Sequence, residues 1–110
     1  MNRRSHTEFL QDILDAIAAI ERFTAGMNVD ELEQDEKTLF AVSRAFEIIG
    51  EAVKNIPETF RAQHPEIPWK AIAGMRDKLI HNYWGIDIQV LWKTIHQDLP
   101  RLKVMISNAL

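Results

Sequence analysis

Three side chains with reactive groups lie close together between Met75 and Tyr83, namely Arg76, His81 and Tyr83. Histidine exchanges protons near neutral pH, and the planar fork of arginine binds oxyanions through two parallel hydrogen bonds. If the segment is a helix, Arg76 lies about 140° around the axis from His81, a gap that a long side chain can span. Asp77, one turn before His81, lies within about 40° of it. This segment is therefore the leading candidate for a catalytic site.

A helix over residues 68–83 is predicted to carry these groups. Proline is favoured in a first helical turn, so Pro68 opens the helix, and Gly85 is a stop signal after it. The apolar residues recur at helical spacing, at Trp69, Ile72, Met75 and Leu79. They anchor one side of the helix and leave Arg76 elsewhere on its circumference.

The other elements are predicted from apolar residues at three- and four-residue spacing, and no stretch alternates with the period of two that a strand requires. The additional helices span about residues 6–25, 36–55, 57–63 and 88–108. The fold class is therefore all-α. We expect an up-down bundle of four to five helices that forms one domain over residues 1–110.

Local signals mark the ends of several helices. Ser5 begins the first helix as the first residue of a capping box, and Gly26 ends it in a left-handed conformation. The acidic segment 27–37 is interpreted as a solvated connector. Asp87 caps the last helix, and Pro100 is expected to bend that helix without breaking it, because the apolar period resumes afterwards.

Composition limits the possible functions. The 110 residues include no cysteine, so disulfides and thiolate metal sites are excluded. The four histidines are too scattered for a metal site, and no nucleotide-binding glycine loop is present, so no metal or other cofactor is expected. No apolar run has the length of a membrane span, and the N-terminus lacks the apolar core of a signal peptide. We therefore expect a cytoplasmic protein that does not bind membranes.

Charge is distributed unevenly along the chain. The formal net charge of −3 argues against a protein that coats nucleic acid non-specifically. Residues 1–51 carry 5 basic and 11 acidic side chains, whereas residues 52–110 carry 8 basic and 5 acidic ones. An anionic substrate is therefore expected to approach the second half of the chain.

The pattern Arg76-x4-His81-x-Tyr83 resembles the signature of HepT-like toxins, a branch of the HEPN ribonuclease superfamily. The resemblance extends over nearly the whole chain, through the segments Arg44–Ala52, Pro65–Trp69, Trp84–Asp87, Leu91–Trp92 and Asp98–Pro100. In the family, the residue after the arginine is polar and often asparagine. Here Asp77 places a negative charge beside the expected anion site.

The resemblance implies a metal-independent endoribonuclease toxin that acts on RNA, not DNA, as a homodimer of a type VII-like toxin–antitoxin pair. In this reading His81 is the general base or the general acid, and Arg76 binds the phosphate. Tyr83 either donates a hydrogen bond to a phosphate oxygen or stacks on a base, and Asp77 orients His81. Trp84, next to Tyr83, serves either as a structural anchor or as a second stacking platform.

The resemblance also implies a partner, a small nucleotidyltransferase antitoxin that adenylylates Tyr83. Two alternatives stay open. The first is a non-catalytic helical module that regulates, or is modified by, the nucleotidyltransferase, and the second is a dimerising bundle without a ligand. On the second helix, Glu47 and Glu51 are interpreted as structural, and Gly50 as a point of close helix contact.

Overall fold

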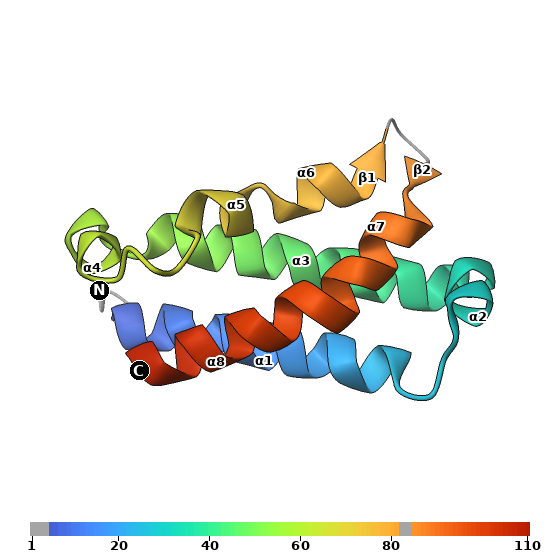
Figure 1. Ribbon diagram of the computed structural model, residues 1–110, viewed down its shortest axis with the longest axis horizontal. Helices are drawn as coiled ribbons and strands as arrows, with labels where there is room; N and C mark the ends of the chain where they lie inside the picture. The colour runs from blue at the N-terminus through green and yellow to red at the C-terminus, as the bar shows by residue number, and fades with distance from the viewer. Residues whose placement is uncertain (1–4, 82–84) are drawn as a thin grey trace, which may run out of the picture.

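The computed structural model describes residues 5–81 and 85–110, and for Ile80 and His81 it describes the backbone alone. Helix α3 (Glu36–Asn55) runs through the middle of the molecule. Helix α1 (His6–Thr24) packs along α3 in the most extensive contact of the fold, and α8 (Leu99–Ala109) packs against α1 (Figure 1). The described residues are overwhelmingly helical, which confirms the all-α prediction.

Helix α1 begins and ends at the predicted signals. The Ser5 hydroxyl oxygen accepts a hydrogen bond from the Glu8 amide at 3.3 Å. Gly26 has a φ of 76°, the left-handed conformation that glycine adopts without steric cost. The interpretation of the following acidic segment as a connector is wrong, because residues Val29–Gln34 form helix α2. A reciprocal capping box between Asn28 and Glu31 starts this helix, so a local signal outweighed the concentration of like charges.

Helix α3 supplies one wall of the hydrophobic core. Asp35 caps it by accepting a hydrogen bond from the Thr38 amide at 3.0 Å, and hydrogen bonds donated by Thr38 lower the pKa of the Asp35 carboxyl group. The buried residues of the helix are Val42, Ala45, Phe46, Ile49, Gly50, Ala52 and Val53. A Cβ added to Gly50 would lie 3.3 Å from the Ala73 carbonyl oxygen, so this glycine permits the close helix contact that was predicted.

The segment that carries the candidate site follows a short helix, α4 (Glu58–Gln63), and is not the single helix predicted over residues 68–83. It consists of α5 (Trp69–Ala73), α6 (Met75–Leu79) and the short strand β1 (Ile80–His81). Strand β1 pairs antiparallel with β2 (Gly85–Ile86), and the two strands project from one edge of the bundle, between α6 and α7 (Figure 1).

Returning backbone explains why α6 stops early. In an uninterrupted helix the Leu79 carbonyl would accept a hydrogen bond from the amide of residue 83. Here it accepts one from the Asp87 amide at 2.9 Å. Gly85, predicted to end a helix, lies in β2 opposite His81. Three residues of the predicted apolar anchor, Trp69, Ile72 and Leu79, are buried, and the fourth, Met75, is partly buried against the core.

The C-terminal helical stretch is continuous from α7 (Ile88–Lys93) through the π-helical turn η1 (Thr94–Asp98) into α8. Asp87 caps α7 as predicted, since its carboxylate accepts a hydrogen bond from the Val90 amide at 3.2 Å. Pro100 does not break the helix, which also agrees with the prediction. The Leu99 amide donates to the Thr94 carbonyl across the wider π turn just before the proline.

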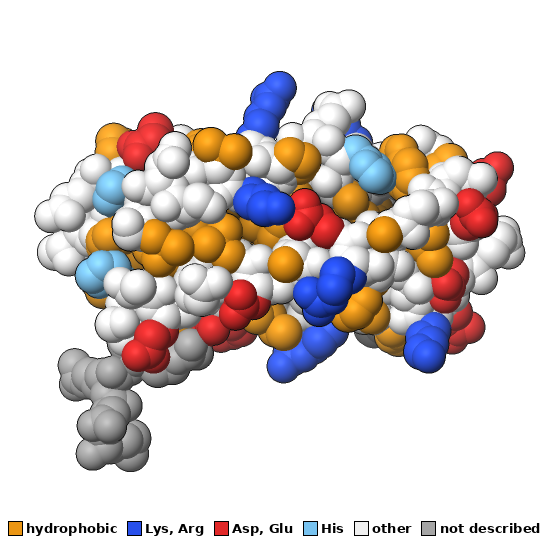
Figure 2. All heavy atoms as spheres, turned by 90° about the horizontal axis from the view of Figure 1, so that it is seen from below, with side chains coloured by type: hydrophobic (Ala, Val, Ile, Leu, Met, Phe, Trp, Pro, Cys, Tyr) orange, Lys and Arg blue, Asp and Glu red, His pale blue; other side chains and the backbone are white. Residues whose placement is uncertain are grey.

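The described surface is mixed in charge. On the face in Figure 2, positive and negative side chains are interspersed around a band of hydrophobic ones. The ion pair between Lys103 and Glu21, 3.1 Å long, connects α8 to α1. Within the described ranges, no helix is both long and apolar enough to span a membrane.

Candidate active site

Arg76 is held by a carboxylate from a different helix. It lies on α6, and its Nε donates a hydrogen bond to Glu47 Oε1 on α3 at 3.1 Å. The other oxygen of that carboxylate, Oε2, accepts a hydrogen bond from Arg44 Nη1 at 3.3 Å. One carboxylate therefore fixes two guanidinium groups on the surface of the bundle.

The anchored guanidinium keeps its anion-binding edge. Glu47 bonds to the Nε side of Arg76, and 45% of the arginine side chain is exposed. Asp77 approaches Arg76 Nη1 only to 3.9 Å, which is longer than a hydrogen bond. Both terminal amino groups can therefore bind phosphate oxygens, with the long side chain already oriented.

His81 lies beyond the end of this helix. Its backbone is in β1, opposite Gly85 of β2, five residues after Arg76. The site is therefore a helix–hairpin junction, and the helical angles expected between His81, Arg76 and Asp77 do not apply. Because His81 is not in the helix, Asp77 does not lie one helical turn before it. The helical spacing therefore no longer supports a role of Asp77 in orienting His81. Tyr83 and Trp84 lie outside the described residues.

Glu47 is the site residue that sequence reasoning missed, because we had interpreted it as structural. It precedes Arg76 by 29 positions, so no local spacing connects the two. The available signal was its place in the segment Arg44–Ala52, which belongs to the family-like pattern. Glu51, its predicted structural companion, lies 4.0 Å from Lys54 on the same helix and does not contact Arg76.

Replacing Glu47 by alanine is expected to lower kcat for RNA cleavage about tenfold without raising KM, because Arg76 loses its orientation while a negative charge leaves the phosphate site. Glu47→Gln should retain most of the rate, since its amide oxygen still accepts the hydrogen bond. Both side chains of the ion pair are substantially exposed, so the melting temperature should hardly change. Steady-state kinetics and thermal melts test this, and equal loss in both variants would contradict it.

Other candidate groups have structural positions. Trp69 is buried, and its indole Nε1 donates to the carbonyl oxygens of Arg61 and His64 at 3.1 and 3.0 Å. The ring of Trp92 lies against that of His96, with centroids 4.1 Å apart. Within residues 5–81 and 85–110, no cluster of three or more histidine or acidic side chains has the arrangement of a metal site.

Comparison with known proteins places this geometry in context. The family model described as "Ribonuclease HepT-like" matches residues 13–109. The chain is 56% identical over 101 residues to "Probable ribonuclease HepT" of Thermococcus cleftensis, with 92% of each chain covered. It is also 45% identical to a "Putative RNase" of Methanocaldococcus jannaschii, over 91% of this chain and 83% of that protein. No solved structure shows a significant match.

Proposed function

Because the chain belongs to the ribonuclease HepT-like family and is an endoribonuclease of that family, we propose that it cuts RNA without a metal ion, at a cleft shared by two copies of the chain. One observation carries this proposal. Glu47 orients Arg76 on α6, directly before the strand that contains His81, so a fixed cation lies five positions from the motif histidine in the sequence. These are the groups that phosphodiester cleavage requires.

The reaction follows from these groups. One imidazole removes the proton of the ribose 2′-hydroxyl, and the 2′-oxygen attacks the adjacent phosphorus. Arg76 stabilises the negative charge that develops on the phosphoryl oxygens. A second imidazole, in its protonated form, donates a proton to the 5′-oxygen as the phosphorus–oxygen bond breaks. The products are a 2′,3′-cyclic phosphate and a 5′-hydroxyl end.

A second copy of the chain supplies the second imidazole, since the motif contains one histidine. The outer face of α3 supports such a homodimer. On this face Phe40 is 67% exposed and Ile48 is also exposed, and the same helix holds Arg76 through Glu47. Large apolar side chains left exposed on the helix that holds the arginine are compatible with a protein contact on this face.

Cleavage in the presence of a chelator tests the proposed function. Purified protein in EDTA is expected to cut single-stranded RNA and to leave cyclic phosphate ends, which mass spectrometry identifies. The matching DNA should stay intact, because it has no 2′-hydroxyl. Cleavage that appears only after a divalent metal ion is added would overturn the metal-independent mechanism, and absence of cleavage would favour a non-catalytic binding module.

We further propose that a nucleotidyltransferase antitoxin neutralises this chain as the toxin of a type VII-like pair. The phenol oxygen of Tyr83 would attack the α-phosphorus of ATP, with release of pyrophosphate, and form a tyrosyl-AMP ester. Tyr83 follows His81 by two positions in the sequence. The attached AMP would therefore add bulk and negative charge beside the groups that bind the RNA phosphate.

Tyr83→Phe is expected to escape this modification, because phenylalanine lacks the attacking oxygen. After co-expression with a nucleotidyltransferase, the intact mass of the wild-type chain should rise by one adenylate, whereas the variant should keep its unmodified mass. The chain contains one tyrosine, so no other phenol can substitute. Full adenylylation of the variant would place the modification on another side chain.

A further inference from the structure

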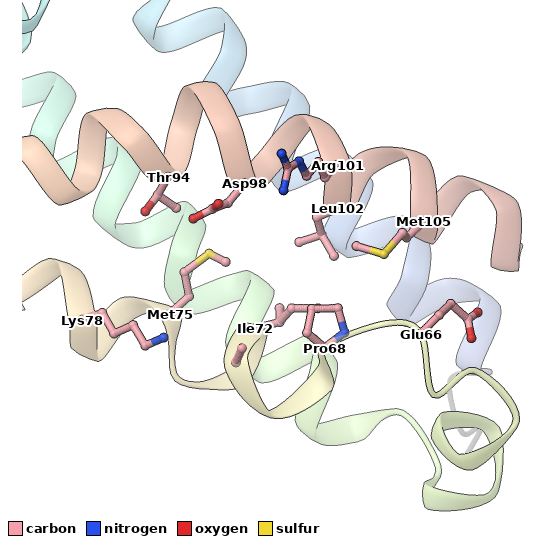
Figure 3. Close-up of a pocket in the computed structure, with 11 residues that line it drawn as sticks. Glu66, Pro68, Ile72, Met75, Lys78, Thr94, Asp98, Arg101, Leu102 and Met105 are labelled. Carbon is pink, nitrogen blue, oxygen red and sulfur yellow. The ribbon is translucent and has the colours of Figure 1, made fainter.

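A pocket of about 400 Å³ lies between the α5–α6 segment and the η1–α8 segment, apart from the ion pair between Arg76 and Glu47 (Figure 3). Ile72 and Leu102 form its floor and are almost fully buried. Met75 and Met105 contribute a thioether from each wall. The pocket therefore offers a flat ligand an apolar and polarisable surface, within the size range of small-molecule sites.

Four charged side chains line this pocket, and three of them have no partner among the described residues, whereas Glu66 lies 3.3 Å from His64 Nδ1. Lys78 and Arg101 supply positive charges, and Asp98 faces Met75 across the opening (Figure 3). None of the three makes an ion pair or a hydrogen bond with the part of the chain that the structure describes. The rim thus combines two free cations and a free hydrogen-bond acceptor around an apolar floor.

Two segments of the family-like pattern, left unused by the cleavage site, meet at this pocket. Glu66 and Pro68 come from the segment Pro65–Trp69, and Asp98 begins the segment Asp98–Pro100. The π turn that ends at Asp98 forms part of the wall, and such turns occur frequently at functional sites. Segments about thirty positions apart in the sequence therefore form opposite sides of one pocket.

We propose that this pocket binds a nucleobase of the RNA substrate, a few nucleotides from the cleaved bond. This inference rests on the proposed function. The thioethers would contact the faces of the base, Asp98 would accept a hydrogen bond from its amino edge, and Lys78 and Arg101 would attract a neighbouring phosphate. Helix α6 carries Lys78 toward the pocket and Arg76 toward α3, so one strand of RNA crosses this short helix and contacts both sites.

Methionine methyl resonances report on the pocket without any cleavage. The chain has four methionines, and among the described ones Met75 and Met105 line the pocket whereas Met27 does not. In protein labelled with ¹³C at the methionine methyls, AMP, GMP, CMP or UMP is expected to shift the Met75 and Met105 signals, and inorganic phosphate is not. If no nucleotide shifts them, or if Met27 shifts equally, the pocket does not bind a base.

Filling the pocket tests its role in cleavage. Ala71 lines it and is exposed, so Ala71→Trp should occupy it without contacting Arg76. Ala62→Trp is the matched control, because Ala62 lines a separate hollow beside α4. An RNA that lacks the single base that occupies the pocket should be cut with a kcat/KM about tenfold lower, both by the wild-type chain and by Ala62→Trp. This is the largest loss expected from one thioether–aromatic contact. Ala71→Trp should be insensitive to that base.

The outcomes separate this inference from the proposed function. If Ala71→Trp keeps the wild-type dependence on the base, the pocket is not a base site even though the chain cuts RNA. If the chain cuts no RNA but nucleotides still shift Met75 and Met105, the cleavage proposal fails and the pocket is a nucleobase site that does not serve RNA cleavage. Asp98→Asn provides a second variant that leaves the apolar floor intact. It should change the order of affinities among the four nucleotides, and an unchanged order would exclude Asp98 from base recognition.

Discussion

Replacing His81 by alanine is expected to reduce the rate of RNA cleavage by about two to four orders of magnitude, because both proton transfers of the reaction lose their imidazole. Quantifying the cyclic phosphate product under single-turnover conditions measures this loss. The melting temperature should change little, since His81 lies in a two-residue strand at the end of the bundle. His96→Ala, an exposed histidine on η1, is the matched control and should cleave at the wild-type rate.

Mixing the two forms tests the shared cleft. Heterodimers of wild-type and His81→Ala chains contain one His81 imidazole in place of two. Adding excess variant to a fixed amount of wild-type chain should therefore suppress cleavage below the level of the wild-type chain alone. Unchanged activity, with chain exchange verified by mass spectrometry, would show that each copy works independently.

Arg76→Ala is expected to lower the rate of cleavage by about two to three orders of magnitude, the loss seen when a group that stabilises transition-state charge is removed. Arg76→Lys should recover only part of the rate. Arginine can bind Glu47 through Nε and a phosphate through its two terminal amino groups at the same time, whereas lysine has one nitrogen for both partners. Single-turnover rates at several salt concentrations measure both variants.

A control on another helix separates local charge from total charge. Arg22→Ala removes an equally positive and exposed side chain from the last turn of α1. It should cleave at nearly the wild-type rate. If Arg22→Ala and Arg76→Ala were equally slow, positive charge as such would govern the reaction, and the oriented guanidinium would have no special role.

The early end of helix α6 decides how Arg76 and His81 are placed along the chain. A helix that continued to residue 83 would place Arg76 and His81 on different sides of one cylinder. Because Asp87 returns to bind the Leu79 carbonyl, the helix ends and the hairpin starts a new direction directly after α6. A position beside a helix end also leaves polar backbone near the reacting groups.

The sequence by itself determined the helical class, the buried faces of the long helices and several of their ends. Ser5, Gly26 and Asp87 act within a few residues of their own positions, so their roles depend on local hydrogen bonds and backbone conformation. Apolar periodicity is equally local, because any helix with one such face must bury it. The same reasoning missed α2, where the capping box of Asn28 and Glu31 was overlooked.

Only the tertiary structure decided how the site is assembled. The bond from Arg76 to Glu47 joins residues 29 positions apart, and the end of α6 depends on backbone that returns from Asp87. The pocket beside Met75 likewise needs walls from two segments. Such contacts form only after the helices have packed, so local propensity and spacing contain no information about them. Packing of the bundle therefore selects the carboxylate that orients the arginine and the point at which the candidate segment leaves the helix.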